Sequence, residues 1–334
     1  MTSNPCFRAS APVRLDFAGG WTDVAPFATE VGGAVVNAAI SLVAEVEVEP
    51  GGRGWRIEAE DLAVSADIPQ NGWTEALSTR LALHKAALCR SGLEACALRT
   101  RSAVPAGSGL GSSGALGVAL VAALDAAGDR RRSPTELAEA AFSIEAVDAA
   151  LPGGKQDQYA AACGGFLHLG FERGAVNVEP LPIDAAFARA LEERIVICYT
   201  GRSRVSSETI SRVMEAYRRA DPVVGAALRN LAMLAAPMAE ALIAGDLAAV
   251  ARHLSENWKW QQQLDPSMRT AEMARLEHAM QTAGALGGKA AGAGAGGSMF
   301  FIAGEDVAAA VRAAEAAGCR VIPFSWSPGG VRLS

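Results

Sequence analysis

The alternation of hydrophobic and polar residues predicts strands near the start of the chain. Residues 8–17 and 34–49 fit this pattern, and the second stretch ends in alternating valine and glutamate up to Val48. Residues 55–59 and 98–102 are shorter candidates, and glycines at 51, 52 and 54 predict a turn before the first of them.

Three stretches between positions 74 and 150 have the residue pattern of helices. Residues 74–90 place Leu77, Leu81, His84 and Leu88 on one face, and Gly92 follows as a stop signal. Residues 115–127 are apolar nearly all round, which predicts a buried helix. A capping box at 133–136 opens a third helix that is expected to end near position 150.

The second half of the chain is richer in helices. A hairpin is predicted over 166–171 and 176–180, and a buried strand over 194–200. The expected later elements are helices at 206–220, 224–244, 247–263 and 266–283 (Asp265 as N-cap), a strand at 298–303, a helix at 305–317, and strands at 319–325 and 330–333. This order predicts an α+β fold with two domains, residues 1–185 and 186–334.

Composition narrows the class of protein. The 334 residues are half hydrophobic and one-fifth charged, enough for about two ordinary domains with a buried core. The net charge of −6 argues against nucleic-acid or anionic-membrane partners, and no apolar run is long enough to span a membrane. No signal-peptide core is visible, and the six cysteines form no CxxC pair. We therefore expect a cytoplasmic protein with free thiols.

Glycine is enriched, at 35 residues, and it is concentrated in clusters. The first glycine loop, residues 105–115, carries Gly107, Gly109, Gly111 and Gly114 between a predicted strand and a helix start. Glycines let the backbone approach an anion, and a helix N-terminus offers free N–H groups. The loop therefore predicts a phosphate cradle, although its spacing matches neither a Walker A nor a GxGxxG motif. A flexible loop is the alternative.

Two further glycine clusters lie near the chain ends. The N-terminal motif, residues 12–23, combines Arg14, two carboxylates, a Gly19–Gly20 turn and Trp21. Carboxylates beside an aromatic ring suit sugar hydroxyls, and a positioned arginine suits a developing phosphoryl charge; an ordinary hairpin turn with a surface ion pair is the alternative. The C-terminal glycine loop, residues 287–297, precedes a hydrophobic strand and is expected to pack over a ligand or over the first glycine loop, rather than act as a linker.

Acidic residues complete the candidate site. Asp157 follows a glycine pair at the start of a predicted helix, where an ionised carboxylate is favoured and can accept a proton from a hydroxyl. Glu145 could ligate a hard cation together with Ser113. A phosphate cradle, an arginine, a base and a magnesium pair are the requirements of phosphoryl transfer. The residues themselves therefore predict ATP-dependent transfer to a hydroxyl.

These motifs resemble the GHMP kinase superfamily, in the same order across nearly the whole chain. The resemblance implies a ribosomal-protein-S5-like N-terminal domain and a ferredoxin-like C-terminal domain, with the active site in the cleft between them. It implies Asp157 and Arg14 as catalytic residues, Ser113 and Glu145 as magnesium ligands, and ATP as phosphate donor. The implied nucleotide-binding residues are Pro105, Gly107, Ser108, Gly109, Leu110, Gly111, Ser112 and Ser113. The expected substrate-binding residues are Asp16, Gly19, Gly20, Trp21, Thr22, Asp23, Lys155, Gln156 and Arg204.

Within the superfamily the resemblance is strongest to the D-glycero-D-manno-heptose 7-phosphate kinases, through residues 17–23, 153–162 and 284–289. It implies phosphorylation of the anomeric hydroxyl of a sugar phosphate, for nucleotide-activated heptose used in surface polysaccharide. L-Fucose kinases share the Gly-Gly-Trp-Thr-Asp string and remain an alternative, as does a non-catalytic ligand sensor. The pattern leaves a homodimer open. Gly114 departs from the usual alanine, which we expect to be tolerated.

A substrate that already carries a phosphate needs a second anion site. Placement and charge suggest Lys155, Arg202, Arg204 and Lys289, with Ser206 and Ser207 at a helix start. A solvated surface charge is an equally good interpretation of each arginine.

Overall fold

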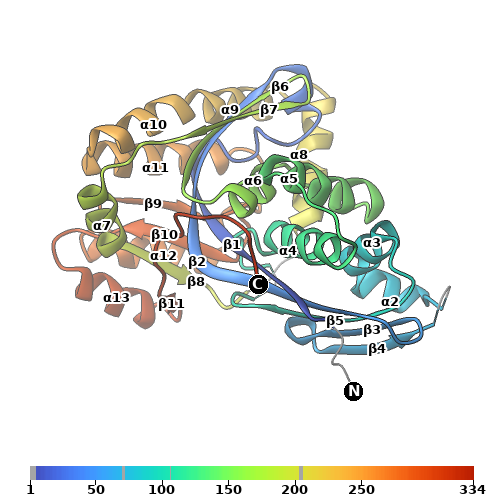
Figure 1. Cartoon of the computed structure of the whole chain (residues 1–334). Helices are drawn as coiled ribbons and strands as arrows, with labels where there is room; N and C mark the ends of the chain where they lie inside the picture. The colour runs from blue at the N-terminus through green and yellow to red at the C-terminus, as the bar shows by residue number, and fades with distance from the viewer. Residues whose placement is uncertain (1–4, 70–71, 106, 203–205) are drawn as a thin grey trace.

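The larger of two β-sheets comes almost entirely from the first half of the chain (Figure 1). The computed structural model describes residues 5–69, 72–105, 107–202 and 206–334. Its described residues form eight strands in this sheet. Six of them follow the order β12-β1-β2-β5-β3-β4, while β6 pairs with β2 outside this order and β7 pairs with β6. The strands are β1 (Phe7–Ala18), β2 (Gly33–Pro50), β3 (Trp55–Ala59), β4 (Val64–Ile68), β5 (Cys96–Ser102), β6 (Phe166–Glu172), β7 (Ala175–Pro180) and β12 (Arg332–Leu333).

Strand β2 connects the two halves of this sheet. Residues 33–38 of β2 pair with β6, and residues 44–50 pair with β5, while β1 runs antiparallel along most of its length. Two register shifts, at Pro12/Val13 and Asp16/Ala18, interrupt the β1–β2 ladder. Such irregularities bend a strand and redirect its side chains. They flank the stretch of β1 that carries Arg14 and Asp16.

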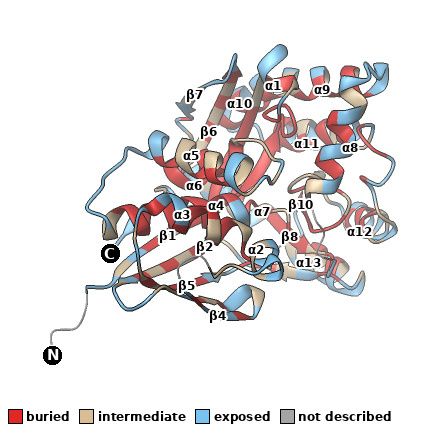
Figure 2. Cartoon of the chain, turned by 90° about the vertical axis from the view of Figure 1, so that its right-hand side faces the viewer, coloured by how far each residue is buried: buried red, intermediate tan, exposed pale blue. Residues whose placement is uncertain are grey.

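One layer of helices covers the larger sheet. Helix α4 (Ser112–Ala127) packs on β1 and β2, beside α3 (Ala82–Ser91), α5 (Pro134–Ser143) and α6 (Gln156–Cys163). Every residue of α4 from Gly114 to Asp125 is buried, as its uniformly apolar sequence predicts (Figure 2). The predicted capping box is confirmed, because Ser133 accepts from the Glu136 amide and the Glu136 side chain accepts from the Ser133 amide. The first glycine loop thus ends in a helix that is fixed on the sheet.

The second sheet belongs to the C-terminal half. It has the order β11-β8-β10-β9 and is antiparallel throughout its described pairs. Its strands are β8 (Ile195–Tyr199), β9 (Gly287–Ala290), β10 (Ser298–Ile302) and β11 (Arg320–Ile322). The helices of this half are α7 (Ala185–Arg194), α8 (Ser206–Arg218), α9 (Pro222–Met233), α10 (Ala235–Ala244), α11 (Leu247–Gln261), α12 (Ala271–Thr282) and α13 (Val307–Ala316). Short turns of helix complete the chain: α1 (Phe27–Glu30), η1 (Glu60–Leu62), α2 (Glu75–Arg80) and η2 (Ile144–Asp148).

Several predicted boundaries differ from the structure. The expected helix over 74–90 is two helices that meet at Leu81, whose ψ of 31° leaves the helical range. The expected helix over 224–244 is divided at Leu234, because Pro237 lacks the N–H that would continue the hydrogen bonding. Helix α12 begins at Ala271 with Thr270 as its N-cap, so the prediction that Asp265 caps it is wrong. Asp265 instead accepts from Arg212 and Ser267.

Strands β4 and β9 were not predicted. Strand β4 has only five residues. Strand β9 lies inside the C-terminal glycine loop, whose glycine-rich composition does not indicate a strand. The C-terminal end of the chain returns to the larger sheet, since Ala9 pairs with Leu333. The division at residue 185 stays a prediction, although the larger sheet's last strand before β12 ends at Pro180.

Within the described residues, one stretch, Pro222–Ala244, is long and apolar enough to cross a membrane by length and composition. In the structure this stretch is the pair α9 and α10, which pack against α11 and β2. The core helices of globular proteins pass the same test, so the stretch is weak evidence for a membrane span.

Candidate active site

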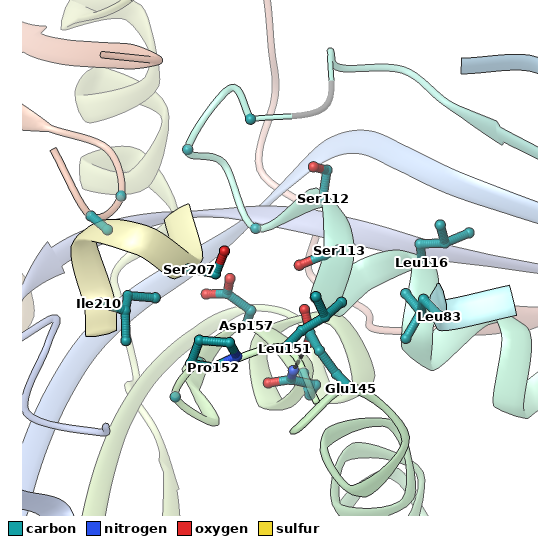
Figure 3. A pocket seen from close by; sticks show the side chains of 18 of the residues that line it. Leu83, Ser112, Ser113, Leu116, Glu145, Leu151, Pro152, Asp157, Ser207 and Ile210 are labelled. Atoms are coloured by element: carbon teal, nitrogen blue, oxygen red, sulfur yellow. Dashed lines mark hydrogen bonds between the residues drawn. The ribbon is translucent and has the colours of Figure 1, made fainter. Parts of the chain in front are cut away.

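A cavity of about 380 Å³ lies where the two halves of the chain meet. It is lined by the first glycine loop, the start of α6, the C-terminal glycine loop at Gly292, and the first turns of α8 at Ser207 and Ile210. Figure 3 shows the side chains of Ser113, Glu145, Asp157 and Ser207 converging on it from four different elements. Residues far apart in sequence therefore share one site, as the motifs predict.

The first glycine loop has the backbone of an anion cradle. Gly107, Gly109 and Gly111 have φ angles of 74°, 81° and 80°, which side-chain-bearing residues rarely adopt. The loop leads directly into the N-terminus of α4, where Ser112 and Ser113 line the cavity. Free amides at that end favour a phosphate.

The C-terminal glycine loop packs on the first glycine loop, as we expected. The Ser298 amide donates to the Ser108 carbonyl at 2.7 Å. A β-carbon on Gly292 would lie 2.5 Å from the Gly109 carbonyl oxygen, so any side chain there would push the two loops apart. The glycines of the two loops therefore let their backbones pack against each other over the cavity.

Three residues of the first glycine loop do not face the cavity. Leu110 is fully buried and its carbonyl accepts from the Arg14 amide at 2.9 Å. Ser108 is fully buried as well, and Pro105 is not part of the lining. The prediction that these three residues bind nucleotide stays a prediction.

Arg14 and Asp157 form the central pair of the site. Arg14 Nε donates to Asp157 Oδ1 at 2.8 Å, and Nη2 lies 2.7 Å from the same oxygen. Nη1 donates to the carbonyls of Gly109 and Ala291, at 2.7 and 3.1 Å. A guanidinium has five N–H donors, and four of these are engaged here. Arg14 thus ties the carboxylate to both glycine loops.

Asp157 lies in the first turn of α6, where the helix dipole favours a negative charge. Its side chain is 24% exposed, compared with 6% for Arg14. Among the described residues no hydrogen bond is made to Oδ2, so that oxygen is available to a ligand. Gly114 packs directly on Asp157, and the Gly-for-Ala departure at this position therefore lets α6 lie close to α4.

Glu145 and Ser113 are brought together, as predicted. Burial raises the pKa of Glu145 to about 7, while hydrogen bonds from Ser113 and Gln158 partly offset that rise. The Gln158 side-chain amide donates at 2.5 Å. Glu145 lies on η2, a wide helical turn at the end of α5. Wide turns of this kind redirect a side chain within a helix, and they often occur at functional sites.

Asp23 faces the same cavity from the N-terminal motif. It accepts from the Gln156 amide at 3.0 Å. Burial, with smaller contributions from the neighbouring charges of Asp157 and Asp16, raises the pKa of Asp23 to about 6. Gly154 must be glycine for this contact, since its β-carbon would lie 1.9 Å from the Asp23 carboxylate.

Trp21 also lines the cavity, with a backbone conformation unusual for its type. Its φ is 82°, and the indole Nε1 is buried with no hydrogen-bond partner among the described residues. Gly19 precedes it at φ 83°, and the Gly19 amide donates to Asn257 of α11 at 2.9 Å. Backbone strain of this kind costs about 1–3 kcal/mol and is concentrated at functional positions. The turn therefore holds Trp21 between the two halves of the chain.

Thr22 and Asp16, both expected to bind substrate, also make structural contacts. Asp16 lines the cavity, and the part of both residues in binding substrate stays a prediction. The Thr22 hydroxyl is fully buried and donates to the Gly19 and Ala34 carbonyls. Asp16 is 2% exposed and pairs with Lys289, whose Nζ lies 2.8 Å from Oδ2. Gly20 packs against this carboxylate, since a β-carbon there would lie 2.1 Å from Asp16 Oδ2.

Three basic residues predicted for a second anion site are paired with carboxylates, and their part in binding a phosphate stays a prediction. Lys289 is fully buried, and burial lowers its pKa. Lys155 lies outside the cavity lining and pairs with Glu139 at 2.8 Å. Arg202 pairs with Glu272 at 3.2 Å. Arg204 lies outside the described residues.

Several residues that shape the site were not indicated by any motif in the sequence. Asn257 and Gln261, one turn apart on α11, bond to Gly19 and to the Gly292 carbonyl. At the far end, the cavity is lined by Asp61, Leu62, Thr79, Arg80, Leu83 and His84. The buried face predicted for 74–90 included His84, but nothing in its spacing linked that face to a ligand.

Two family models match the chain: the GHMP kinases N terminal domain over residues 76–165 and the GHMP kinases C terminal domain over residues 238–319. A curated relative, the D-glycero-alpha-D-manno-heptose 7-phosphate kinase of Campylobacter jejuni, is 31% identical over 312 residues, covering 88% of each protein. The chain belongs to the GHMP kinases. Its predicted α+β fold, with S5-like and ferredoxin-like parts, is therefore confirmed.

Other relatives of this GHMP kinase include a crystal structure of a D-glycero-D-manno-heptose 1-phosphate kinase from Bacteroides thetaiotaomicron. It has a TM-score of 0.80 and 28% identity, and the alignment covers 98% of each chain. The bifunctional fucokinase/GDP-fucose pyrophosphorylase of Arabidopsis thaliana is 28% identical over 89% of this chain but only 30% of its own length. GHMP kinases transfer phosphate from ATP to a hydroxyl, and this chain is such a phosphotransferase.

Proposed function

We propose that this GHMP kinase phosphorylates the anomeric hydroxyl of D-glycero-alpha-D-manno-heptose 7-phosphate, giving the 1,7-bisphosphate. The observation that carries the proposal is the Arg14–Asp157 pair, set against the first glycine loop and open to the cavity. The sugar-kinase relative that spans nearly the whole chain supports the substrate class.

Each part of the site has a task in this reaction. Asp157 Oδ2 accepts the proton of the acceptor hydroxyl as the hydroxyl oxygen attacks the γ-phosphorus of ATP, and the bond from that phosphorus to the bridging oxygen breaks to release ADP. Arg14 holds Asp157 in place and keeps the two glycine loops at fixed distances from it. Amides of the first glycine loop and of the start of α4 bind the phosphates. Asp23, Gln156 and Trp21 orient the sugar ring.

Magnesium fits the Ser113–Glu145 pair by the chemistry of its donors. Both offer oxygen, the ligand atom Mg²⁺ prefers, and Mg²⁺ in kinases is held by one or two protein oxygens plus phosphate. The buried Glu145 carboxylate, with its raised pKa, gains from a nearby cation. Bound Mg²⁺ neutralises charge on the triphosphate. The described residues contain no group of three or more His, Cys, Asp or Glu that could hold a metal ion.

A second candidate is an unphosphorylated acceptor such as L-fucose. One observation favours it. Among the described residues, the cation beside Asp157 is Arg14, whose donors are already engaged by Asp157 and two carbonyls and so do not bind a phosphate on the acceptor. The Arabidopsis relative has a name that includes fucokinase.

A coupled ADP-release assay separates these candidates. Heptose 7-phosphate, the same heptose without phosphate, mannose and L-fucose are compared at matched concentrations with Mg-ATP. The proposal predicts the highest kcat/KM for heptose 7-phosphate, by at least tenfold. A preference for fucose would favour the second candidate, and the absence of turnover with every sugar would favour a ligand sensor. A cytoplasmic location, a homodimer and a role in surface polysaccharide stay predictions.

A further inference from the structure

Positive charge is scarce beside Asp157. The acceptor side of the cavity has the carboxylates of Asp16, Asp23 and Asp157, and its described basic residue, Arg14, is 5% exposed and engaged. Lys289, which is fully buried, forms an ion pair with Asp16 and neutralises its charge. A phosphate on the acceptor would be repelled here and must lie elsewhere.

A second cavity, of about 560 Å³, adjoins the first. The two share Val24, Pro152, Gly153 and Ile210 as lining, so they meet at the Pro152–Gly153 turn. Pro152 and Ile210 lie at the edge of the first cavity, near Asp157 (Figure 3). The far side of the second cavity is formed by α8, through Ser211, Arg212, Met214, Glu215 and Arg218.

The basic residues of the second cavity retain donors. The Arg212 Nε donates to Asp265 at 2.9 Å and Nη2 to Ser267 at 3.0 Å, which fixes the guanidinium and leaves Nη1 without a partner among the described residues. Arg218 lies 3.8 Å from Glu215, beyond hydrogen-bond distance. Glu215 is equally far from Arg219, so its single charge is shared between two arginines.

We propose that the second cavity binds the phosphate that the acceptor already carries. The sugar would lie across Gly153, with its reacting hydroxyl at Asp157 and its remote phosphate at Arg218 and Arg212 Nη1. Arginine forks match phosphate oxygens in charge and geometry. This inference rests on the proposed function, because only a phosphorylated acceptor needs the subsite.

Arg218→Ala tests the subsite, and Arg219→Ala is its matched control. The two residues are neighbours in sequence, Arg218 as the last residue of α8 and Arg219 directly after it. They carry the same charge and share Glu215, but Arg219 does not line the cavity. For Arg218→Ala we expect the KM for heptose 7-phosphate to rise about tenfold or more, as loss of a charge-assisted hydrogen bond implies. The kcat and the KM for ATP should change less than threefold, since the remote phosphate takes no part in the reaction. Arg219→Ala should leave all three within twofold.

The acceptor without its phosphate separates the two proposals. Its KM should be the same in wild type and in Arg218→Ala, and well above the wild-type KM for the 7-phosphate. If wild type prefers the 7-phosphate but the two arginine variants behave alike, the subsite is wrong and the proposed function stands. If Arg204→Ala alone raises that KM, Arg204 binds the phosphate and the subsite is likewise wrong. If wild type does not discriminate between the acceptors, both proposals fail.

Discussion

Gly114 packs so tightly on Asp157 that a β-carbon on the glycine would lie 2.5 Å from the aspartate Cβ. It would also lie 3.1 Å from the Asp157 carbonyl carbon and from the Gln158 amide. The contact is with backbone and with the base of a side chain, so neither can rotate away. Helix α6 must shift if the glycine is replaced, and Asp157 would move with it.

Gly114→Ala is therefore expected to lower kcat by about 10–100-fold, since displacing a reacting group by a fraction of an ångström is costly. Gly117→Ala, one turn along α4, is the control, because its β-carbon would have no neighbour closer than 3.5 Å. That variant should keep full activity and gain up to about 1 kcal/mol of stability from helix propensity. Steady-state kinetics and urea unfolding of both variants give the comparison; equal activities would contradict the packing argument.

Replacing Asp157 with Asn removes the proton acceptor and keeps the shape. We expect kcat to fall by about 10³-fold, within the range for loss of a general base. ATP binding, measured by calorimetry, should stay within threefold of wild type. Near-normal turnover would rule out the assigned role.

Arg14→Lys should also lower kcat, because a single ammonium cannot replace the contacts with Asp157, Gly109 and Ala291.

The ion pair between Asp16 and Lys289 joins β1 to β9, and both side chains are almost completely buried. Lys289→Met alone would leave the Asp16 charge unpaired, which costs about 3–5 kcal/mol in unfolding free energy. The double variant Asp16→Asn with Lys289→Met should lose clearly less than the sum of the single changes. Additive losses in urea unfolding would show that the two residues are not coupled.

Glu145→Gln removes a charge from the proposed magnesium pair. The concentration of Mg²⁺ needed for half-maximal rate should rise about tenfold, the lower end for a changed metal ligand. Ser113→Ala should shift it in the same direction. Glu139→Gln serves as control, because this carboxylate pairs with Lys155 away from the cavity. An unchanged Mg²⁺ requirement in Glu145→Gln would refute the assignment.

Stability should depend on pH through His84. Burial lowers the pKa of His84 to about 4, against 6.5 for the exposed side chain. The unfolded chain therefore binds more protons than the folded one between these values, and stability falls as the pH drops below 6.5. This residue alone contributes about 2 kcal/mol of loss at pH 5 relative to pH 7.5. Urea unfolding at both pH values should show that His84→Gln, which keeps a polar contact to Thr100, has a smaller loss. An identical loss in wild type and variant would contradict this.

Secondary-structure elements that depend on local sequence patterns could be predicted well from the sequence. Strands β1, β2 and β3, the buried helix α4 and the capping box at Ser133 follow from local periodicity and hydrogen-bonding chemistry. Elements fixed by distant contacts were predicted less well. β9 is a strand because β10 pairs with it. The division of the expected 224–244 helix has a local cause instead, since hydropathy does not register that Pro237 lacks an N–H.

The sequence by itself determined that a phosphate cradle, an acidic base and a basic partner occur together, because glycine spacing and residue type are local properties. It also determined that Gly107, Gly109 and Gly111 must be free of side chains. Only the tertiary structure decided which charges are available. Asp16, Lys155 and Lys289 resemble ligands in the sequence, yet each is neutralised by a partner 16 or more positions away. Contacts between distant segments decide whether a charged group keeps an atom available to a ligand, as Asp157 keeps Oδ2 beside Arg14, while Lys289 is fully buried against Asp16.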